Sequence, residues 1–251
     1  MHRKQISGPS APYSARLVRL LANLSSPEAV EIPGCFAERM GRLFDLADTI
    51  ALDAARQRPA AGPFIAESGT ATHLQADLDH SRDSLVERID QAFSDGGTAT
   101  LRLPTPMPDE TPPSFKPYQR FYLAQQRQLI ATVQPLRLRI RQTMAAHSPA
   151  LAQLAALDTV FDNTLSIYSR RGFATLPKVL EKRFITLWQA HLKDLPKADR
   201  DSHPGDWITP EAWLHQFHQE MRMMLLAELE IRLEPILGLL DALNHKDHNL
   251  Q

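Results

Sequence analysis

Apolar side chains recur at steps of three and four residues through the middle of this chain, and this periodicity is the strongest constraint on its fold. Such spacing places side chains on one face of an α-helix. It runs through three consecutive segments, 117–146, 148–169 and 175–193, which we predict to be helices. Pro135 is expected to kink the first helix because proline lacks a backbone donor, and Gly172 is expected to end the second. The face predicted to be buried in the first helix consists of Tyr118, Tyr122, Leu129, Val133, Leu136, Ile140 and Met144.

Four further helices are predicted outside this region. One begins at Ser14, a second spans residues 33–58, a third ends at Phe93, and the last opens at Thr209 and is kinked or divided by Pro235. The apolar stripe of the second, at the near-3.5-residue spacing typical of paired helices, consists of Phe36, Met40, Leu43, Ala47, Ile50 and Ala54. We therefore predict an all-α fold, an antiparallel bundle of about seven helices in which the last four form the core.

Glycine and proline divide the chain into regions. Residues 1–13 are expected to be a flexible tail, 14–93 an N-terminal helical region, 94–116 a Gly/Pro-rich linker, and 117–245 a C-terminal helical bundle. The two helical regions form either separate units or one domain. Within the linker, the sequence TATLRL is compatible with a short strand, although a lone strand has nothing to pair with.

Charge is strongly segregated along the chain, although the formal net charge is only −1. Residues 114–193 hold 12 Lys/Arg and 3 Asp/Glu, a net of +9, whereas 67–113 and 194–251 each have a net of −6. This asymmetry indicates either a basic surface for an anionic partner or helices that neutralise one another. The residues at which we expect a partner to bind are Arg120, Leu123, Arg127, Ile130, Arg137 and Arg141 in one group and Arg170, Arg171, Lys178 and Lys182 in a second.

Two kinds of partner fit these basic groups. Nucleic acid would pair its phosphates with the cations and stack its bases on Tyr118, Phe121 and Tyr122. Internal neutralisation or a protein partner is the favoured interpretation, because the two acidic segments together outweigh the basic region. The leucine and isoleucine at positions 123 and 130 also interleave with the arginines, which suits contact with protein better than a track for phosphates.

No residues form a convincing catalytic arrangement. The sharpest metal-like pattern is His215-x-x-His218, with Glu211, Glu220 or His203 as further ligands. It matches neither the HExxH zinc motif nor the ExxH pattern of di-iron bundles, so we interpret it as structural. The chain also lacks a Walker loop and a Rossmann glycine motif. These observations favour a protein without enzymatic activity, metal or cofactor.

Cysteine usage and hydropathy indicate a cytoplasmic protein. Cys35 is the only cysteine, which excludes an intrachain disulfide and fits a reducing compartment. It lies near a predicted helix start, where a thiol can become reactive, but no histidine is near it in the sequence to act as a base. No run of 18 apolar residues and no apolar segment after the basic N-terminus occur, so neither a membrane span nor a secretory signal is predicted.

Four long segments are jointly specific: RLFDLADTIALDAA, FKPYQRFYLAQQRQL, LAALDTVFDNTLSIYSRRGFATLPKVLEKRF and WLHQFHQEMRMMLLAELEIRLEPILGLLDAL. With them the chain resembles an uncharacterised proteobacterial family that is catalogued only as a domain of unknown function. The resemblance covers most of the chain beyond the N-terminal tail and implies an all-helical fold without a known activity. It also implies an accessory role beside an envelope complex of the MotA/TolQ and OmpA kinds.

The sequence does not identify an activity, and it favours a non-enzymatic function. We predict a cytosolic helical interaction or scaffold protein that binds a protein partner or itself through helix faces, possesses no cofactor, takes no small-molecule substrate and meets a membrane only through a partner. The alternative is a nucleic-acid-binding protein that uses the basic helices at residues 116–141 and 170–183.

Overall fold

The computed structural model describes residues 14–24, 43–57, 62–65, 69–94, 100–105, 113–194, 209 and 212–248. Regular structure in these residues is entirely helical and consists of α1 (Ser14–Leu24), α3 (Leu46–Gln57), α4 (Thr70–Phe93), α5 (Lys116–His147), α6 (Pro149–Asp194) and α7 (Trp213–His248). The all-α prediction is therefore confirmed, and six helices in the described part are close to the seven expected. The predicted tail at 1–13, Cys35 and most of the predicted linker lie outside the described residues.

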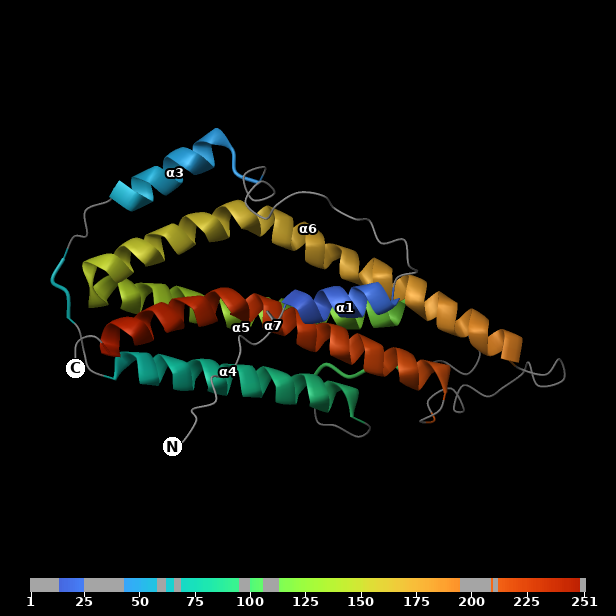
Figure 1. Cartoon of the computed structure of the whole chain (residues 1–251). Coiled ribbons are helices and arrows are strands. Elements are labelled where there is room, and N and C mark those ends of the chain that lie inside the picture. The colour runs from blue at the N-terminus through green and yellow to red at the C-terminus, as the bar shows by residue number, and fades with distance from the viewer. Residues whose placement is uncertain are drawn as a thin grey trace, which may run out of the picture.

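The four long helices form an antiparallel bundle (Figure 1). α5 and α7 contact each other, and α4 and α6 lie on opposite sides of this pair, each touching both helices. α7 is the central element, because it contacts α1, α4, α5 and α6. α5, α6 and α7 thus supply the predicted core, and α4 joins them. Of the short helices, α1 packs on α7 and α6, whereas α3 touches only α6 among the described helices.

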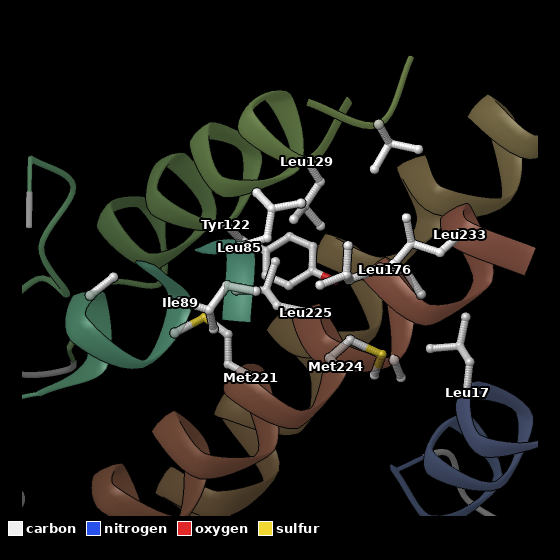
Figure 2. Close-up of a cluster of buried hydrophobic side chains, with 14 of the residues drawn as sticks. Leu17, Leu85, Ile89, Tyr122, Leu129, Leu176, Met221, Met224, Leu225 and Leu233 are labelled. Atoms are coloured by element: carbon white, nitrogen blue, oxygen red, sulfur yellow. The ribbon is translucent and has the colours of Figure 1, made fainter. Parts of the chain in front are cut away.

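One hydrophobic core runs through the bundle, and its centre is shown in Figure 2. Side chains from five helices meet there, because each helix has an apolar face of the kind that the sequence spacing predicts. The predicted face of α5 is buried at all seven positions from Tyr118 to Met144. The residues labelled in Figure 2 are Leu17 of α1, Leu85 and Ile89 of α4, Tyr122 and Leu129 of α5, Leu176 of α6, and Met221, Met224, Leu225 and Leu233 of α7.

α6 is one continuous helix of 46 residues, so the prediction that Gly172 ends a helix is wrong. The helix bends near its middle (Figure 1), where Pro177 leaves the carbonyl oxygen of Phe173 without its usual backbone donor. Gln126 of α5 replaces that donor, since its Nε2 donates to this oxygen at 3.2 Å. A contact from a neighbouring helix therefore allows α6 to continue past the proline.

α5 and α7 also continue through their prolines. Pro135 lies inside α5 and Pro235 inside α7, so Pro235 does not divide its helix. Each proline frees a carbonyl four residues earlier, at Ala131 and Ile231. Ala131 and Pro135 are exposed and Ile231 and Pro235 are half-buried, so water can hydrate the freed carbonyls.

The predicted helix at residues 33–58 is not continuous, because residues 43–45 are not helical and α3 begins at Leu46. Residues 33–42 of this prediction lie outside the described residues. A reciprocal pair of hydrogen bonds explains the start of α3: Asp48 N donates to Asp45 Oδ1 at 2.8 Å and Asp45 N donates to Asp48 Oδ2 at 3.1 Å. This arrangement is a capping box, which satisfies two backbone donors at the helix start. Thr164 of α6 also donates to Asp48 at 2.6 Å. This hydrogen bond is the largest cause of the lowered pKa of Asp48.

The short segment 100–105, which contains part of TATLRL, forms no strand in the described residues. Leu101 and Leu103 instead pack against the core, and Leu103 N donates to the carbonyl oxygen of Ala92 at 3.1 Å. This contact holds the segment against the end of α4.

Candidate functional site

Two arginines of α5 bind two aspartates of α6. Arg137 and Arg141 are one helical turn apart, as are Asp158 and Asp162, so the two pairs can face each other across the helix contact. Arg137 donates to both carboxylate oxygens of Asp158, at 3.0 and 2.6 Å, and to Asp162 at 2.7 Å. Arg141 donates to the same two carboxylates at 2.6 and 3.0 Å. Multiple charge-assisted hydrogen bonds of this kind fix the orientation of the guanidinium planes.

The acids that neutralise these arginines come from the basic region itself, because Asp158 and Asp162 both lie within residues 114–193. Only two ion pairs join described cations of that region to the acidic segments beside it. Arg139 pairs with Asp77 at 2.7 Å, and Arg183 pairs with Glu220 at 2.6 Å. The hydrogen bond from Arg183 to Glu220 raises the pKa of the Arg183 guanidinium.

A second polar network surrounds Glu228 of α7, whose side chain is fully buried. Tyr122 donates to Glu228 at 3.0 Å and Gln126 donates to it at 2.8 Å. Arg232 donates twice to its other oxygen, at 3.0 and 2.6 Å, and lies 4.0 Å from the centroid of the Phe173 ring. Burial, reinforced by the charge of Glu228, raises the pKa of Tyr122 well above its usual value, so the phenol stays protonated and remains a donor.

A groove of about 330 Å³ opens between α5, α6 and α7, between the two networks. Arg137, Arg141 and Arg232 line it, together with the carboxylate of Asp162. The remaining lining is mostly apolar and consists of Ile130, Val133, Gln134, Leu138, Ser169, Phe173, Ile231 and Pro235. The groove therefore brings together three of the ten residues that the sequence nominated for partner binding, Ile130, Arg137 and Arg141.

The other nominated residues of α5 lie on its exposed side. Arg120, Leu123 and Arg127 follow one another at steps of three and four residues and are all exposed. Leu138 lies further along the same stripe; 39 % of Leu123 and 52 % of Leu138 is accessible to solvent. Arg120 and Arg127 form no ion pair among the residues that the structure describes, and α5 contains no acidic residue in its whole length. We call the stripe of Lys116, Arg120, Leu123, Arg127 and Leu138 the cationic face of α5.

The second nominated group lies on α6. Arg170, Arg171, Lys178 and Lys182 are all exposed. Arg170 donates to the Ser166 carbonyl within its own helix, and the other three form no ion pair in the described part of the chain. The large apolar side chains exposed on the same helix are Ile167, Tyr168 and Ile185.

The aromatic residues of α5 that would stack on bases are not available for it. Tyr118, Phe121 and Tyr122 are buried in the core. Tyr118 contacts the rings of Phe184 and Phe217, with centroids 5.5 and 5.7 Å apart. These rings stabilise the end of the bundle and do not accompany the exposed cations.

The histidine pair of α7 is part of this aromatic cluster. His218 is buried, and its ring centroid is 5.5 Å from Tyr118. Glu220, one of the further ligands considered, is bound to Arg183, while Glu211 and His203 lie outside the described residues. Where the chain is described, no three His, Cys, Asp or Glu side chains gather at a spacing suited to a metal. Burial, and to a smaller extent the charge of His215, lowers the pKa of His218 to about 4.

These observations define an all-α bundle protein with internally paired arginines, a groove between three helices and cationic outer faces. No helix in the described part is both long and apolar enough to cross a membrane. The family described as "Protein of unknown function (DUF3348)" matches residues 3–245, and the chain belongs to it. The family resemblance of the sequence is thereby confirmed. No curated protein and no solved structure matches the chain.

Sequence reasoning missed the acidic and amide residues of the site. Asp158, Asp162, Gln126 and Glu228 were not singled out, although they orient every arginine that lines the groove. A signal was present for the first two: an Arg pair and an Asp pair, each four residues apart, on consecutive helices predicted to be antiparallel. Glu228 and Gln126 lie on apolar helix faces, where a polar residue points to a buried hydrogen-bond network.

Proposed function

We propose that this chain is a non-enzymatic, cytoplasmic interaction protein that binds an acidic protein partner through the cationic face of α5. The observation that supports this is the composition of that face. It carries exposed leucine side chains beside cations that form no ion pair within the described residues, and α5 itself contains no acidic residue. Exposed apolar side chains are stabilised by contact with an apolar surface on a partner. The cations favour acidic side chains around that surface and increase the rate of association.

α6 presents further cations at the same level of the bundle. Gln126 lies opposite Phe173, and the two helices run antiparallel, so Arg120 is level with Lys178 to within about one helical turn. The second nominated group therefore lies at a height along the hairpin of α5 and α6 similar to that of the first. A partner with two acidic stretches would engage both.

The proposal is tested by affinity purification of the full chain from its native host, with nuclease treatment of the lysate. We expect an acidic protein to co-purify after nuclease treatment; the first candidates are components of the MotA/TolQ-like inner-membrane complex that the family resemblance implied. Leu123→Glu and Arg120→Glu/Arg127→Glu should each weaken binding of the purified partner at least about tenfold. Arg88→Glu is the control for charge reversal, because it turns one exposed cation of α4 into an acid, and it should leave binding unchanged. Equal binding by Leu123→Glu, or an equal loss with Arg88→Glu, would contradict the proposal.

Nucleic-acid binding is the alternative, and the same variants separate it. It requires a shift of DNA or RNA that weakens steeply with salt and is lost in Arg120→Glu/Arg127→Glu but retained in Leu123→Glu. Burial of Tyr118, Phe121 and Tyr122 speaks against it, because the exposed cations then lack adjacent stacking rings from α5.

A second surface supports self-association. Ile50, Ala47 and Ala54 of the predicted pairing stripe are exposed on α3, and 61 % of Ile50 and 76 % of the adjacent Leu46 is accessible. The opposite side of α3 packs on α6. We infer that this outward face of α3 binds a second copy of the chain.

A further inference from the structure

The groove between α5, α6 and α7 has the features of a built ligand site. Its volume of about 330 Å³ falls in the range of small-molecule pockets. It is lined by elements that the core holds rigidly, since Val133 of α5, Phe173 of α6 and Ile231 of α7 either belong to the core or pack against it. The site is thus preformed.

Hydrogen-bond donors in the groove lining are fixed by partners outside it. Asp158 and Glu228, which do not line the groove, hold the guanidinium groups of Arg141 and Arg232 from behind. Nη1 of Arg141 and Nη1 of Arg232 make no hydrogen bond within the residues that the structure describes. Because these donors are held in place before binding, a carboxylate entering the groove would find oriented partners.

The rest of the groove lining is mostly apolar. Ile130 and Leu138 of α5 and Ile231 and Pro235 of α7 contribute side chains without charge or donors. A ligand that fits both parts of this lining has an apolar body and an anionic end. Arg137, Arg141 and Arg232 are already matched in number by Asp158, Asp162 and Glu228, so a single negative charge suits the site better than two.

Asp162 is the carboxylate that an incoming anion meets. It is the only acid that lines the groove among the described residues, and its side chain is more exposed than that of Asp158. It shares Arg137 and Arg141 with Asp158, so both arginines keep an ion pair when Asp162 is displaced. Asp162 therefore occupies the groove's cations in the free protein and competes with the ligand.

We propose that this groove binds an amphipathic monocarboxylate, with its carboxylate at Arg141 and Arg232 and its apolar body along Ile130, Leu138 and Ile231. No motif in the sequence indicates a small-molecule ligand, because the groove lining comes from three different helices. The groove and the cationic face of α5 share Leu138. Arg120, Leu123 and Arg127 do not line the groove, so the variants that test the acidic partner leave the groove lining unchanged.

Isothermal titration calorimetry of the full chain at pH 7, with octanoate and with the uncharged octanamide as probes, tests the proposal. We expect octanoate to bind at one site and octanamide to bind at least about tenfold more weakly, because only the carboxylate forms charge-assisted hydrogen bonds. Absence of octanoate binding, or equal binding of octanamide, would overturn the proposal.

Three variants locate the site. Asp162→Asn removes the competing charge and should tighten octanoate binding about fivefold. Ser169→Phe places a ring in the groove from an exposed position and should abolish binding. Ala174→Phe adds the same ring at an exposed position of α6 that does not line the groove, and it should bind octanoate like the wild type. Weaker or unchanged binding by Asp162→Asn, or parallel losses in the two phenylalanine variants, would show that octanoate binds elsewhere.

Discussion

Glu228 places a carboxylate in the fully buried centre of the bundle, where Tyr122, Gln126 and Arg232 bind it. Removing the only cation that pairs with a buried carboxylate leaves an uncompensated charge. We therefore expect Arg232→Met to lower the free energy of unfolding by about 3–5 kcal/mol, measured by urea denaturation at pH 7. Adding Glu228→Gln to Arg232→Met should restore much of this loss, because the charge is then gone. A loss as small as that of an exposed ion pair would show that water reaches Glu228.

His218 gives stability a pH dependence of predictable sign. Its pKa falls from 6.5 to about 4 in the folded protein, so between these values the unfolded chain binds the proton more tightly. The contribution of His218 to the free energy of unfolding is therefore fully present above pH 6.5. It is lost as the pH falls toward 4, and the total loss is about 3 kcal/mol. The slope of unfolding free energy over pH 4–6.5 should flatten in His218→Leu and persist in the exposed-position control His73→Gln. A wild-type slope in His218→Leu would refute this assignment.

At the scale of single residues, the sequence predicted burial better than pairing. The buried positions of α5 followed from spacing alone, since an apolar stripe has one favourable direction. Arg137 and Arg141, which the sequence places on one helix sector, share their partners in the structure, but those partners, Asp158 and Asp162, were not predicted. A carboxylate on a polar helix face looks the same in sequence whether it meets water or an arginine. Only the register of α5 against α6 distinguishes the two cases.

Among the elements, α6 allows a direct test of why local rules failed. Gly172 lies inside the helix, is exposed, and has no atom within 4 Å of the position that a Cβ would take. Gly172→Ala should therefore raise the free energy of unfolding by about 0.5–1 kcal/mol, because glycine is the more flexible residue in the unfolded chain. Gly69→Ala is the contrasting control: φ at Gly69 is +84°, a conformation that disfavours alanine, so this variant should destabilise. Destabilisation by Gly172→Ala in a thermal or urea melt would mean that α6 is interrupted there.

Helix boundaries were predicted only where the signal is local. The start of α5 and the cap-then-proline start of α6 were expected and are observed. The continuity of α6 past Pro177 was not, because the replacement donor, Gln126, comes from another helix. A helix start at Leu46 was not predicted although Asp45-x-x-Asp48 is a capping-box pattern, because the apolar stripe continues through this position without a break.

On the scale of the whole molecule, charge segregation along the sequence does not become charge segregation in space. Part of the basic region is neutralised by its own two aspartates, part by Asp77 and Glu220, and part remains exposed on α5 and α6. The sequence alone could not predict which cations fall into each of these three groups, because the pairing of each cation depends on which helices touch. The exposed remainder is what makes an acidic partner the favoured proposal.

The outward face of α3 makes a prediction about the assembly of whole chains. Burying Leu46 and Ile50 against a second copy removes apolar surface from water. Light scattering coupled to gel filtration should therefore give twice the monomer mass, and Ile50→Glu should give the monomer mass because the charge would be buried in the seam. Leu123→Glu is the matched control, since it adds the same charge on α5. It should leave the dimer intact while weakening binding of the acidic partner. A monomeric wild type, or a dimer that survives Ile50→Glu, would leave the exposed stripe of α3 without the role assigned to it.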